Sequence, residues 1–524
     1  VVLSPTNGTV NSTTIHARLK AGLSINNYSG NITCSTTSGS NQTIGLSGTS
    51  YNGENSSVNY YVDDSGDDSN NGLTDSTPFL TLSQAISTAT SGTATIINVG
   101  AGTYTEHTVN INKTNLTIRG AGSASTIFDS NTANKGFMSI TVSDVTVEKI
   151  TIKDYNFTSA STTSNAYGGA GIRVGVTPGN SAVSSTLSGI TIKDIIFDSN
   201  YTDANSGDGG AIEFQTHNSP YNTTTTATID GCIFKSNRAG TDGSEVSGHN
   251  GGAIMGKRQL TLTVKNSVFY DNDADYTGAA INIWSNGGSS TLTMDNSTLY
   301  DNTSFTNDSG MIAQFFTIGT VTSYVNNCII YGADIGNADS FDVDGQNESG
   351  HYTTTITMRN SLIGDYSTTE YTYNVSNVTE GSDPLFTSTA NDDYTLQDNS
   401  PAVDNGNAAY APSDDVNDLT RPQGQADDMG AYERRNTWDG STDTDWSTAA
   451  NWSEDIVPVA GRSPIIADVT NQPVISSDDG SSGNVSLEDI TINSGAELTV
   501  NKEASLTLTG DFTNNSGSVY LESD

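Results

Sequence analysis

Basic residues are scarce in this chain of 524 residues, in which 20 Lys and Arg face 59 Asp and Glu and leave a net charge of -39. Such a chain repels the phosphates of nucleic acids, so we expect no nucleic-acid partner. The same charge disfavours a uronic-acid polymer as substrate, because a cleft for such a polymer needs positive side chains or bound cations. A cation such as Ca²⁺ is the more natural small partner.

Long apolar runs are absent and cysteines are few. No run approaches the roughly 20 apolar residues that span a bilayer, so we expect no membrane insertion. The chain starts at Val1 without Met or a signal-like apolar segment, and we expect a processed chain or a fragment. With only three Cys, few Lys and abundant Asn, Thr and Ser, the composition suits an extracellular or cell-surface protein.

What remains is mostly uncharged and polar, with 33% hydrophobic residues, 15% charged residues and 52 Gly. Val, Ile and Thr occur throughout, together with 22 Tyr and 14 Phe, unlike a disordered acidic tail. This composition predicts an all-β protein with many tight turns.

A short pattern repeats from residue 116 onward: a β-branched run, a polar pair, an apolar step, then Asn or Asp and a Gly-rich loop. Its period of about 30 to 37 residues is typical of a solenoid with one coil per repeat. The clearest repeats are 190–200 (ITIKDIIFDSN), 228–237 (TIDGCIFKSN), 262–272 (LTVKNSVFYDN), 292–302 (LTMDNSTLYDN), 324–331 (YVNNCIIY) and 356–364 (ITMRNSLIG).

Stacked coils place matching positions about 4.8 Å apart, so each aligned position becomes a column of side chains. We expect a column of apolar residues to fill the interior and a column of asparagines to share amide hydrogen bonds at a turn. These structural columns are Phe197, Phe234, Phe269, Leu299, Ile330 and Ile363, and Asn200, Asn237, Asn272 and Asn302.

Two further recurrences support this register. Gly-rich corners at 209–212, 251–254 and 278–281 (GGAI, GGAI, GAAI) mark the entry of another strand, where glycine permits a positive φ. Cys232 and Cys328 share one aligned position three coils apart, beyond disulfide reach. We therefore interpret both as small core residues, which leaves Cys34 unpaired.

Composition divides the chain into three parts: a small β segment at 1–58, a solenoid at 59–435 and a β-rich module at 436–524. At the solenoid's start, Pro and helically spaced apolar residues at 77–86 (TPFLTLSQAI) predict a short amphipathic helix that caps the open end of the coil stack. In the last part, ITI, LTV and LTL recur every eight residues from 490, which predicts a narrow β-roll-like stack that is still running at Asp524.

Several motifs resemble extracellular right-handed parallel β-helix proteins of the pectate-lyase-like superfamily. The opening motifs are YVDDSGDDSNNG (61–72), TPFLTLSQAI, INVGAGTYTE (97–106), NLTIRGAG (115–122) and TIFDS (126–130). The closing motifs, DPLF (383–386), DYTLQDNSPAVDNG (393–406) and LTRPQGQADDMGAYE (419–433), resemble the closing, anchor-associated segment of the same bacterial proteins. The resemblance implies a right-handed parallel β-helix and a surface location more than an activity.

The last part carries a second resemblance. Trp438-Asp-Gly, Asp445-Trp and Asn451-Trp resemble modules of large secreted adhesins in Bacteroidota-type bacteria. This likeness implies an adhesin module, with any sorting or anchoring domain beyond the chain.

Lyases of the fold that this chain resembles use Lys or Arg as a base, with acidic residues that hold Ca²⁺. The residues that suit this role are Lys257, Arg258 and Arg238, with Asp208, Glu213, His217 and His249 on neighbouring coils. The spacing does not force them together, and a Lys-Arg pair on a loop is also typical of a solvated surface. Hydrolases of this fold class use clustered Asp, but Asp194 and Asp230 align with Asn266, Asn296, Asn327 and Asn360, which indicates a turn column.

Two other sets of side chains are suited to binding a ligand. An Asx-rich loop offers oxygen ligands for Ca²⁺ from Asp63, Asp64, Asp67, Asp68 and Asn71, although Asx turns explain the same residues without metal. Aromatic residues suited to stacking on sugar rings are Tyr155, Tyr201, Tyr276 and Trp284, and cross-coil packing explains them equally well.

The sequence thus predicts an all-β extracellular rod in a surface adhesin or a fibre, which associates with itself or other surface proteins and contacts glycans. The alternatives are a polysaccharide lyase or hydrolase, and a carbohydrate-binding module without catalysis.

Overall fold

The computed structural model describes residues 26–34, 42–50, 57–130, 134–157, 168–179, 181–203, 207–215, 223–240, 249–304, 311–332, 343–345, 355–366, 372–477 and 483–522. The chain forms two compact units, 1–58 and 59–524. In the first unit, β1 (Asn26–Cys34) and β2 (Gln42–Ser50) pair as an antiparallel hairpin. The side chain of Cys34 lies outside the described set. Where the structure describes the chain, no helix has both the length and the apolar character needed to cross a membrane.

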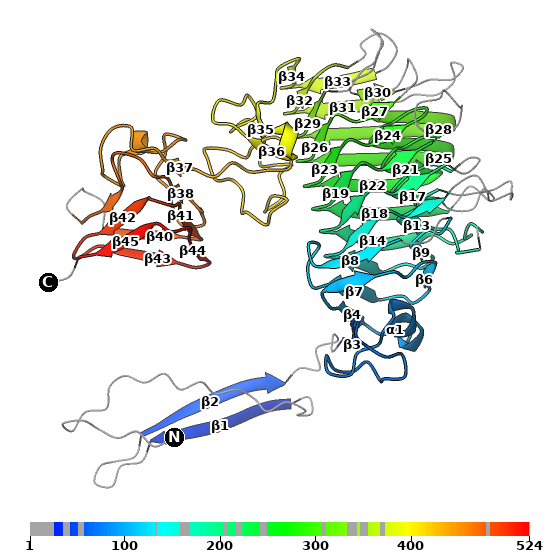
Figure 1. Ribbon diagram of the computed structural model, residues 1–524, viewed down its shortest axis with the longest axis horizontal. Coiled ribbons are helices and arrows are strands. Elements are labelled where there is room, and N and C mark those ends of the chain that lie inside the picture. Colours follow the sequence, from blue (N-terminus) through cyan, green and yellow to red (C-terminus); the bar gives the residue numbers. More distant parts are fainter. Residues whose placement is uncertain are drawn as a thin grey trace. The chain divides into compact units, whose positions relative to one another are not determined.

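The second unit is built on a parallel β-helix, as predicted (Figure 1). Each coil contributes strands to three long faces, and the strands of successive coils pair in parallel. Face 3 shows the register most simply, because Phe197 pairs with Phe234, Phe234 with Phe269 and Phe269 with Leu299. The predicted column of interior residues is confirmed, since all of these side chains are buried in one core.

Face 1 comprises β6 (Val109–Ile111), β9 (Met138–Ile140), β13 (Ile172–Val174), β17 (Ile212–Phe214), β21 (Ile254–Lys257) and β30 (Val343–Gly345). Face 2 comprises β3 (Val58–Val62), β4 (Thr95–Val99), β7 (Leu116–Gly120), β10 (Val145–Glu148), β14 (Leu187–Lys193), β18 (Thr224–Asp230), β22 (Gln259–Lys265), β31 (Thr355–Arg359) and β33 (Thr372–Ser376). The long strands β25 (Ile281–Asp295) and β28 (Ile312–Asn326) run through both faces and join them into one sheet.

Face 3 is a ten-stranded sheet of β5 (Gly102–Tyr104), β8 (Thr126–Asp129), β11 (Thr151–Lys153), β15 (Ile196–Asp198), β19 (Ile233–Lys235), β23 (Val268–Tyr270), β26 (Thr298–Tyr300), β29 (Ile329–Tyr331), β32 (Leu362–Ile363) and β34 (Thr379–Glu380). A short fourth face holds β12 (Asn156–Phe157), β16 (Tyr201–Thr202), β20 (Arg238–Ala239), β24 (Asp273–Ala274) and β27 (Thr303–Ser304).

The predicted helix caps the first coils. Helix α1 (Leu82–Thr88) buries Leu82 and Ile86 in the same core as the coils, and the hydroxyl of its N-cap, Thr81, accepts a hydrogen bond from the main chain of Gln84 at 3.1 Å. The helix begins later than Pro78, because Phe79 forms a parallel bridge with Val62 and the chain is still extended there.

Backbone conformation explains the Asp and Asn at the corner between faces 2 and 3. Asn266, Asn296, Asn327 and Asn360 all have φ between 42° and 52°, and Asp194 has φ 52°. This left-handed region favours Gly, Asn and Asp. Asp230 does not belong to this column, contrary to the predicted alignment. It pairs with Lys193 as the last residue of β18, and Gly231 takes the left-handed position instead.

The asparagine ladder is confirmed. The Asn200 amide donates to Asn237 Oδ1 at 3.0 Å, Asn237 to Asn272 Oδ1 at 3.0 Å, and Asn272 to Asn302 Oδ1 at 2.8 Å. All four side chains are buried. Cys232 and Cys328 are buried and free, as predicted.

Beyond the coils lie β35 (Phe386–Ser388), a short 3-10 turn η1 (Thr389–Asn391) and β36 (Asp393–Leu396), then a second parallel stack with its own core. Its sheets are β37 (Thr437–Trp438), β38 (Ile465–Ile466), β41 (Ile490–Ile492) and β44 (Phe512–Asn514); β39 (Val474–Ile475), β42 (Glu497–Val500) and β45 (Ser518–Leu521); and β40 (Asn484–Leu487) and β43 (Ser505–Leu508), with η2 (Ala449–Asn451) between β37 and β38.

The eight-residue repeat therefore carries the chain from one face of this stack to the next, which gives three-sided coils and not a two-sided roll. Trp438, Trp446 and Trp452 pack edge to face or stacked in its core, so the Trp motifs are structural.

Candidate functional site

Three charged residues suggested by the sequence converge on the outer side of face 1. Lys257 ends β21, Glu213 lies in the middle of β17 on the preceding coil, and Asp208 precedes β17. The Lys257 Nζ atom lies 2.6 Å from Asp208 Oδ2 and 2.8 Å from Glu213 Oε1. The side chains of Lys257, Asp208 and Glu213 are 9%, 5% and 0% exposed. Lys257 is thus not part of a solvated surface.

The electrostatics of this Lys257 cluster bear on the predicted role of Lys257 as a base. Its two carboxylate neighbours raise the pKa of the Lys257 ammonium, although burial opposes them. Burial raises the pKa of the Glu213 carboxyl, while Lys257 and Arg173 act in the opposite direction. A general base must be unprotonated, so a raised pKa disfavours Lys257 in that role.

A polar chain holds Asp208 in place. The main-chain N–H of Asn250 donates to Asp208 Oδ1 at 2.7 Å, and its side-chain amide reaches the same oxygen at 3.2 Å. Thr277, one coil further, donates to Asn250 Oδ1 at 2.7 Å. These three residues precede the left-handed glycines Gly209, Gly251 and Gly278 of the predicted corners. The corner repeat therefore positions Asp208 as well as the next strand.

The other predicted basic residues lie elsewhere. Arg238 lies over the ring of Tyr201 at 4.7 Å, on the fourth face. Arg258 lies 5.9 Å from the ring centroid of Trp284. The imidazole of His249 is bound to the carbonyl of Gly207 at 2.9 Å, and His217 lies outside the described residues. Arg238 and Arg258 thus each face an aromatic ring.

The aromatic candidates differ in exposure. Tyr155 was expected to be an exposed sugar-stacking residue, but it is completely buried, because its ring packs 5.1 Å from Phe137 and its hydroxyl donates to the Glu106 carbonyl at 2.5 Å. Tyr201, Tyr276 and Trp284 are partly exposed and remain candidates for glycan contact.

The Asx-rich loop uses its oxygens internally. Asp63 accepts from Ser65, Asp67 from Ser69, Asp68 from Leu80 and Thr81, and Asn71 from Leu73, while Asp64 lies beside Gly102. In the ranges described above, no three His, Cys, Asp or Glu side chains are grouped to hold a metal ion. Asx turns account for Asp63, Asp67 and Asn71, whereas Asp68 holds the main chain just before helix α1.

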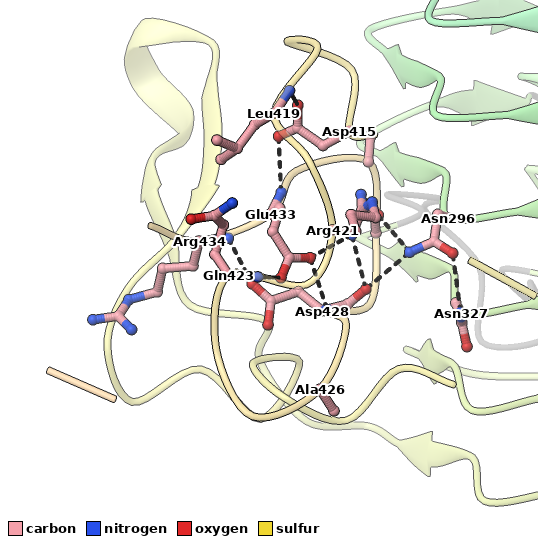
Figure 2. Close-up of polar contacts among 12 residues, drawn as sticks. Asn296, Asn327, Asp415, Leu419, Arg421, Gln423, Ala426, Asp428, Glu433 and Arg434 are labelled. Atoms are coloured by element: carbon pink, nitrogen blue, oxygen red, sulfur yellow. Dashed lines mark hydrogen bonds and ion pairs between the residues drawn. The ribbon is translucent and has the colours of Figure 1, made fainter. Parts of the chain in front are cut away.

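A second polar cluster, which the sequence did not reveal as a site, lies in residues 383–435, hereafter the closing segment (Figure 2). Arg421 and Glu433 form a fully buried ion pair at 2.7 Å. Glu433 also accepts from the main chain of Gln423 at 2.7 Å and of Asp428 at 3.0 Å. Burial raises the pKa of the Asp428 and Glu433 carboxyls, and Arg421 opposes this shift. The LTRPQGQADDMGAYE motif thus folds on itself around one arginine.

The closing segment docks on the corner column of the β-helix. Asn296 donates from its side-chain amide to the Asp428 carbonyl at 2.9 Å, as Figure 2 shows. Asn327 donates to the Asn407 carbonyl at 3.0 Å, and Asn266 to the Asp414 carbonyl at 2.8 Å. Three successive coils are therefore held by one segment distant in the sequence. The column was predicted as turn residues, and its role in docking was not predicted.

Comparisons with known proteins add the following. The family model "Domain of unknown function (DUF8693)" matches residues 437–524. No curated protein matches the chain. Among solved structures, a pectin methylesterase from carrot is 11% identical with a TM-score of 0.30, covering 62% of this chain and 88% of its own. The pectin methylesterase PemA from Erwinia chrysanthemi is 13% identical with a TM-score of 0.28, covering 64% and 91%. Likenesses this low do not bear on activity.

Proposed function

We propose that this protein is an extracellular load-bearing rod, as the stalk of a surface adhesin or a subunit of an extracellular fibre. The docking of the closing segment on three successive coils carries this proposal. In a solenoid each coil contacts only its neighbours, so the stack can open from one end. A segment bound to Asn266, Asn296 and Asn327 resists such opening, because these coils can separate only after it detaches.

The columns of side chains inside the β-helix also resist opening of the coil stack. The ten strands of face 3 give nine spacings of about 4.8 Å, a continuous ladder of about 43 Å. Within it, the buried Phe197, Phe234 and Phe269 rings stack nearly parallel, with centroids 4.7 and 4.5 Å apart. A ladder of this kind is stiff, since every coil shares backbone and side-chain contacts with the next.

The catalytic alternative has weaker support than the rod. Lys257 is paired with two carboxylates, and Arg258 and Arg238 lie beside aromatic rings. The partly exposed Tyr201, Tyr276 and Trp284 are the residues that we propose for glycan contact, and self-association or binding to other surface proteins completes the adhesive role.

Protease treatment of intact producing cells tests location and role together. We expect peptides from 59–435 to be released from intact cells, and cells that lack the protein to adhere less to glycan-coated surfaces. Recovery of these peptides only after lysis would contradict the extracellular proposal. Turnover of acidic polysaccharides to unsaturated products that absorb in the ultraviolet, abolished by Lys257→Ala, would favour the lyase instead.

A further inference from the structure

We propose that Lys257 and Asp208 join in an intramolecular isopeptide bond, with Glu213 relaying the proton, so that two successive coils become covalently linked. The inference rests on the Lys257 cluster alone and does not depend on the load-bearing function. The reaction requires no metal, oxidant or further reactant, because the amide and the water that it forms both derive from the side chains themselves.

The reacting groups are already in contact. Lys257 Nζ and Asp208 Oδ2 lie 2.6 Å apart, and Glu213 Oε1 lies 2.8 Å from the same nitrogen. A contact of this kind between a nucleophile on β21 and an acyl group in the corner before β17 replaces a bimolecular encounter and supplies a large effective concentration. The register holds them there, since β17 and β21 pair from Ile212 and Ile254 onward.

Burial makes the neutral forms accessible. A salt bridge withdrawn from water carries a desolvation cost, and Asp208 Oδ2 lies 2.6 Å from the ammonium nitrogen. The proton therefore has a direct path from the nitrogen to this oxygen, which yields an amine and a carboxylic acid. Burial also raises the pKa of Glu213, which favours its protonated form. In the described part of the chain, no group donates a hydrogen bond to Glu213 Oε2, so this oxygen is available to carry a proton.

Hydrogen bonds also activate the carboxyl carbon of Asp208 toward attack by the lysine nitrogen. The N–H and amide of Asn250 both donate to Asp208 Oδ1, at 2.7 and 3.2 Å. When the lysine nitrogen attacks Cγ, negative charge develops on this oxygen, and donors placed there beforehand stabilise the tetrahedral intermediate. Lys257 attacks from the side of Oδ2, which then becomes the leaving oxygen.

The reaction balances without an external partner. The Nζ–Cγ bond forms, and Glu213 gives its proton to the departing Oδ2 hydroxyl while it takes one from the nitrogen. The Cγ–Oδ2 bond breaks, one water leaves, and Glu213 ends in its starting state. Because the cluster is buried, water has little access to reverse the reaction.

Mass spectrometry of the intact, denatured full chain tests the proposal. We expect its mass to be lower than the sequence mass by one water, and trypsin to yield a branched peptide in which residues 194–235 are joined to residues 239–258. Folded protein with the full sequence mass, and Lys257 cleavable by trypsin, would refute the bond.

Three variants separate this bond from other mass changes. Lys257→Arg should restore the full mass, and Glu213→Gln should slow or abolish the loss. Asp208→Asn should give the same branched peptide with loss of ammonia in place of water, which keeps a positive outcome available if another variant fails to fold. Lys265→Arg changes an ion pair with Asp230 (3.1 Å) near the surface, and this control should lose water like the natural chain. Retention of the water loss in Lys257→Arg would overturn the assignment.

Discussion

The side-chain amide of Asn237 donates to Asn272 Oδ1 at 3.0 Å, although 35 residues separate them. Both side chains are fully buried, and Asn237 also donates to the Phe197 carbonyl at 3.0 Å. A single residue thus satisfies polar groups on the coils before and after its own. This relationship shows how a repeat becomes a continuous scaffold.

Asn237→Ala should destabilise the coils around it by about 2–4 kcal/mol, because the Asn200 amide and other buried polar groups lose their partner. Hydrogen exchange followed by mass spectrometry is expected to show faster exchange from β15 to β23 first. The exposed Asn112 provides the control, and Asn112→Ala should leave the pattern unchanged. Equal protection in both variants would show that the ladder adds no stability.

Phe234→Ala should cost about 3–5 kcal/mol, since it leaves a cavity between the rings of Phe197 and Phe269. Phe234→Leu should cost much less, because Leu299 fills the same column in a later coil. Denaturant unfolding followed by circular dichroism compares the two. Similar losses would mean that ring stacking, and not filled volume, dominates at this position.

Arg421→Met removes one partner of a buried ion pair and should destabilise the closing segment by about 3–5 kcal/mol. Limited proteolysis should then cut residues 383–435 early. The matched control is Arg119→Met, because Arg119 pairs with Glu148 on the surface and such pairs are worth at most about 1 kcal/mol. A closing segment as resistant in Arg421→Met as in the control would be inconsistent with this network.

The pH dependence of stability should carry a contribution from Asp273. Burial raises its pKa from 3.8 to about 6, with Arg238 acting against the shift. The folded state therefore binds this proton more tightly than the unfolded state. The stability that protonated Asp273 contributes is fully present below about pH 3.8 and is lost as the pH rises through about 6. Asp273→Asn should flatten the decline of the unfolding midpoint between these values, and an unchanged profile would argue against the shift.

Periodicity made the β-helix and its columns predictable. Phe234 and Asn237 recur at one-coil intervals, and matching positions must then touch. The Lys257 cluster was predictable only as candidate residues, because Asp208 precedes one Gly-rich corner, Lys257 ends the strand after the next corner, and the sequence spacing does not force them together. The docking of Asn296 on Asp428 was not predictable, since the closing segment has no repeat that places it against a particular coil.

Single-molecule force spectroscopy tests the load-bearing role most directly, with the full chain pulled from its ends and compared with an Asn296→Ala, Asn327→Ala double variant. We predict that the natural chain resists until the closing segment detaches, and that the double variant opens at lower force. If both chains unravel coil by coil at the same low force, the closing segment bears no load and the rod proposal is contradicted.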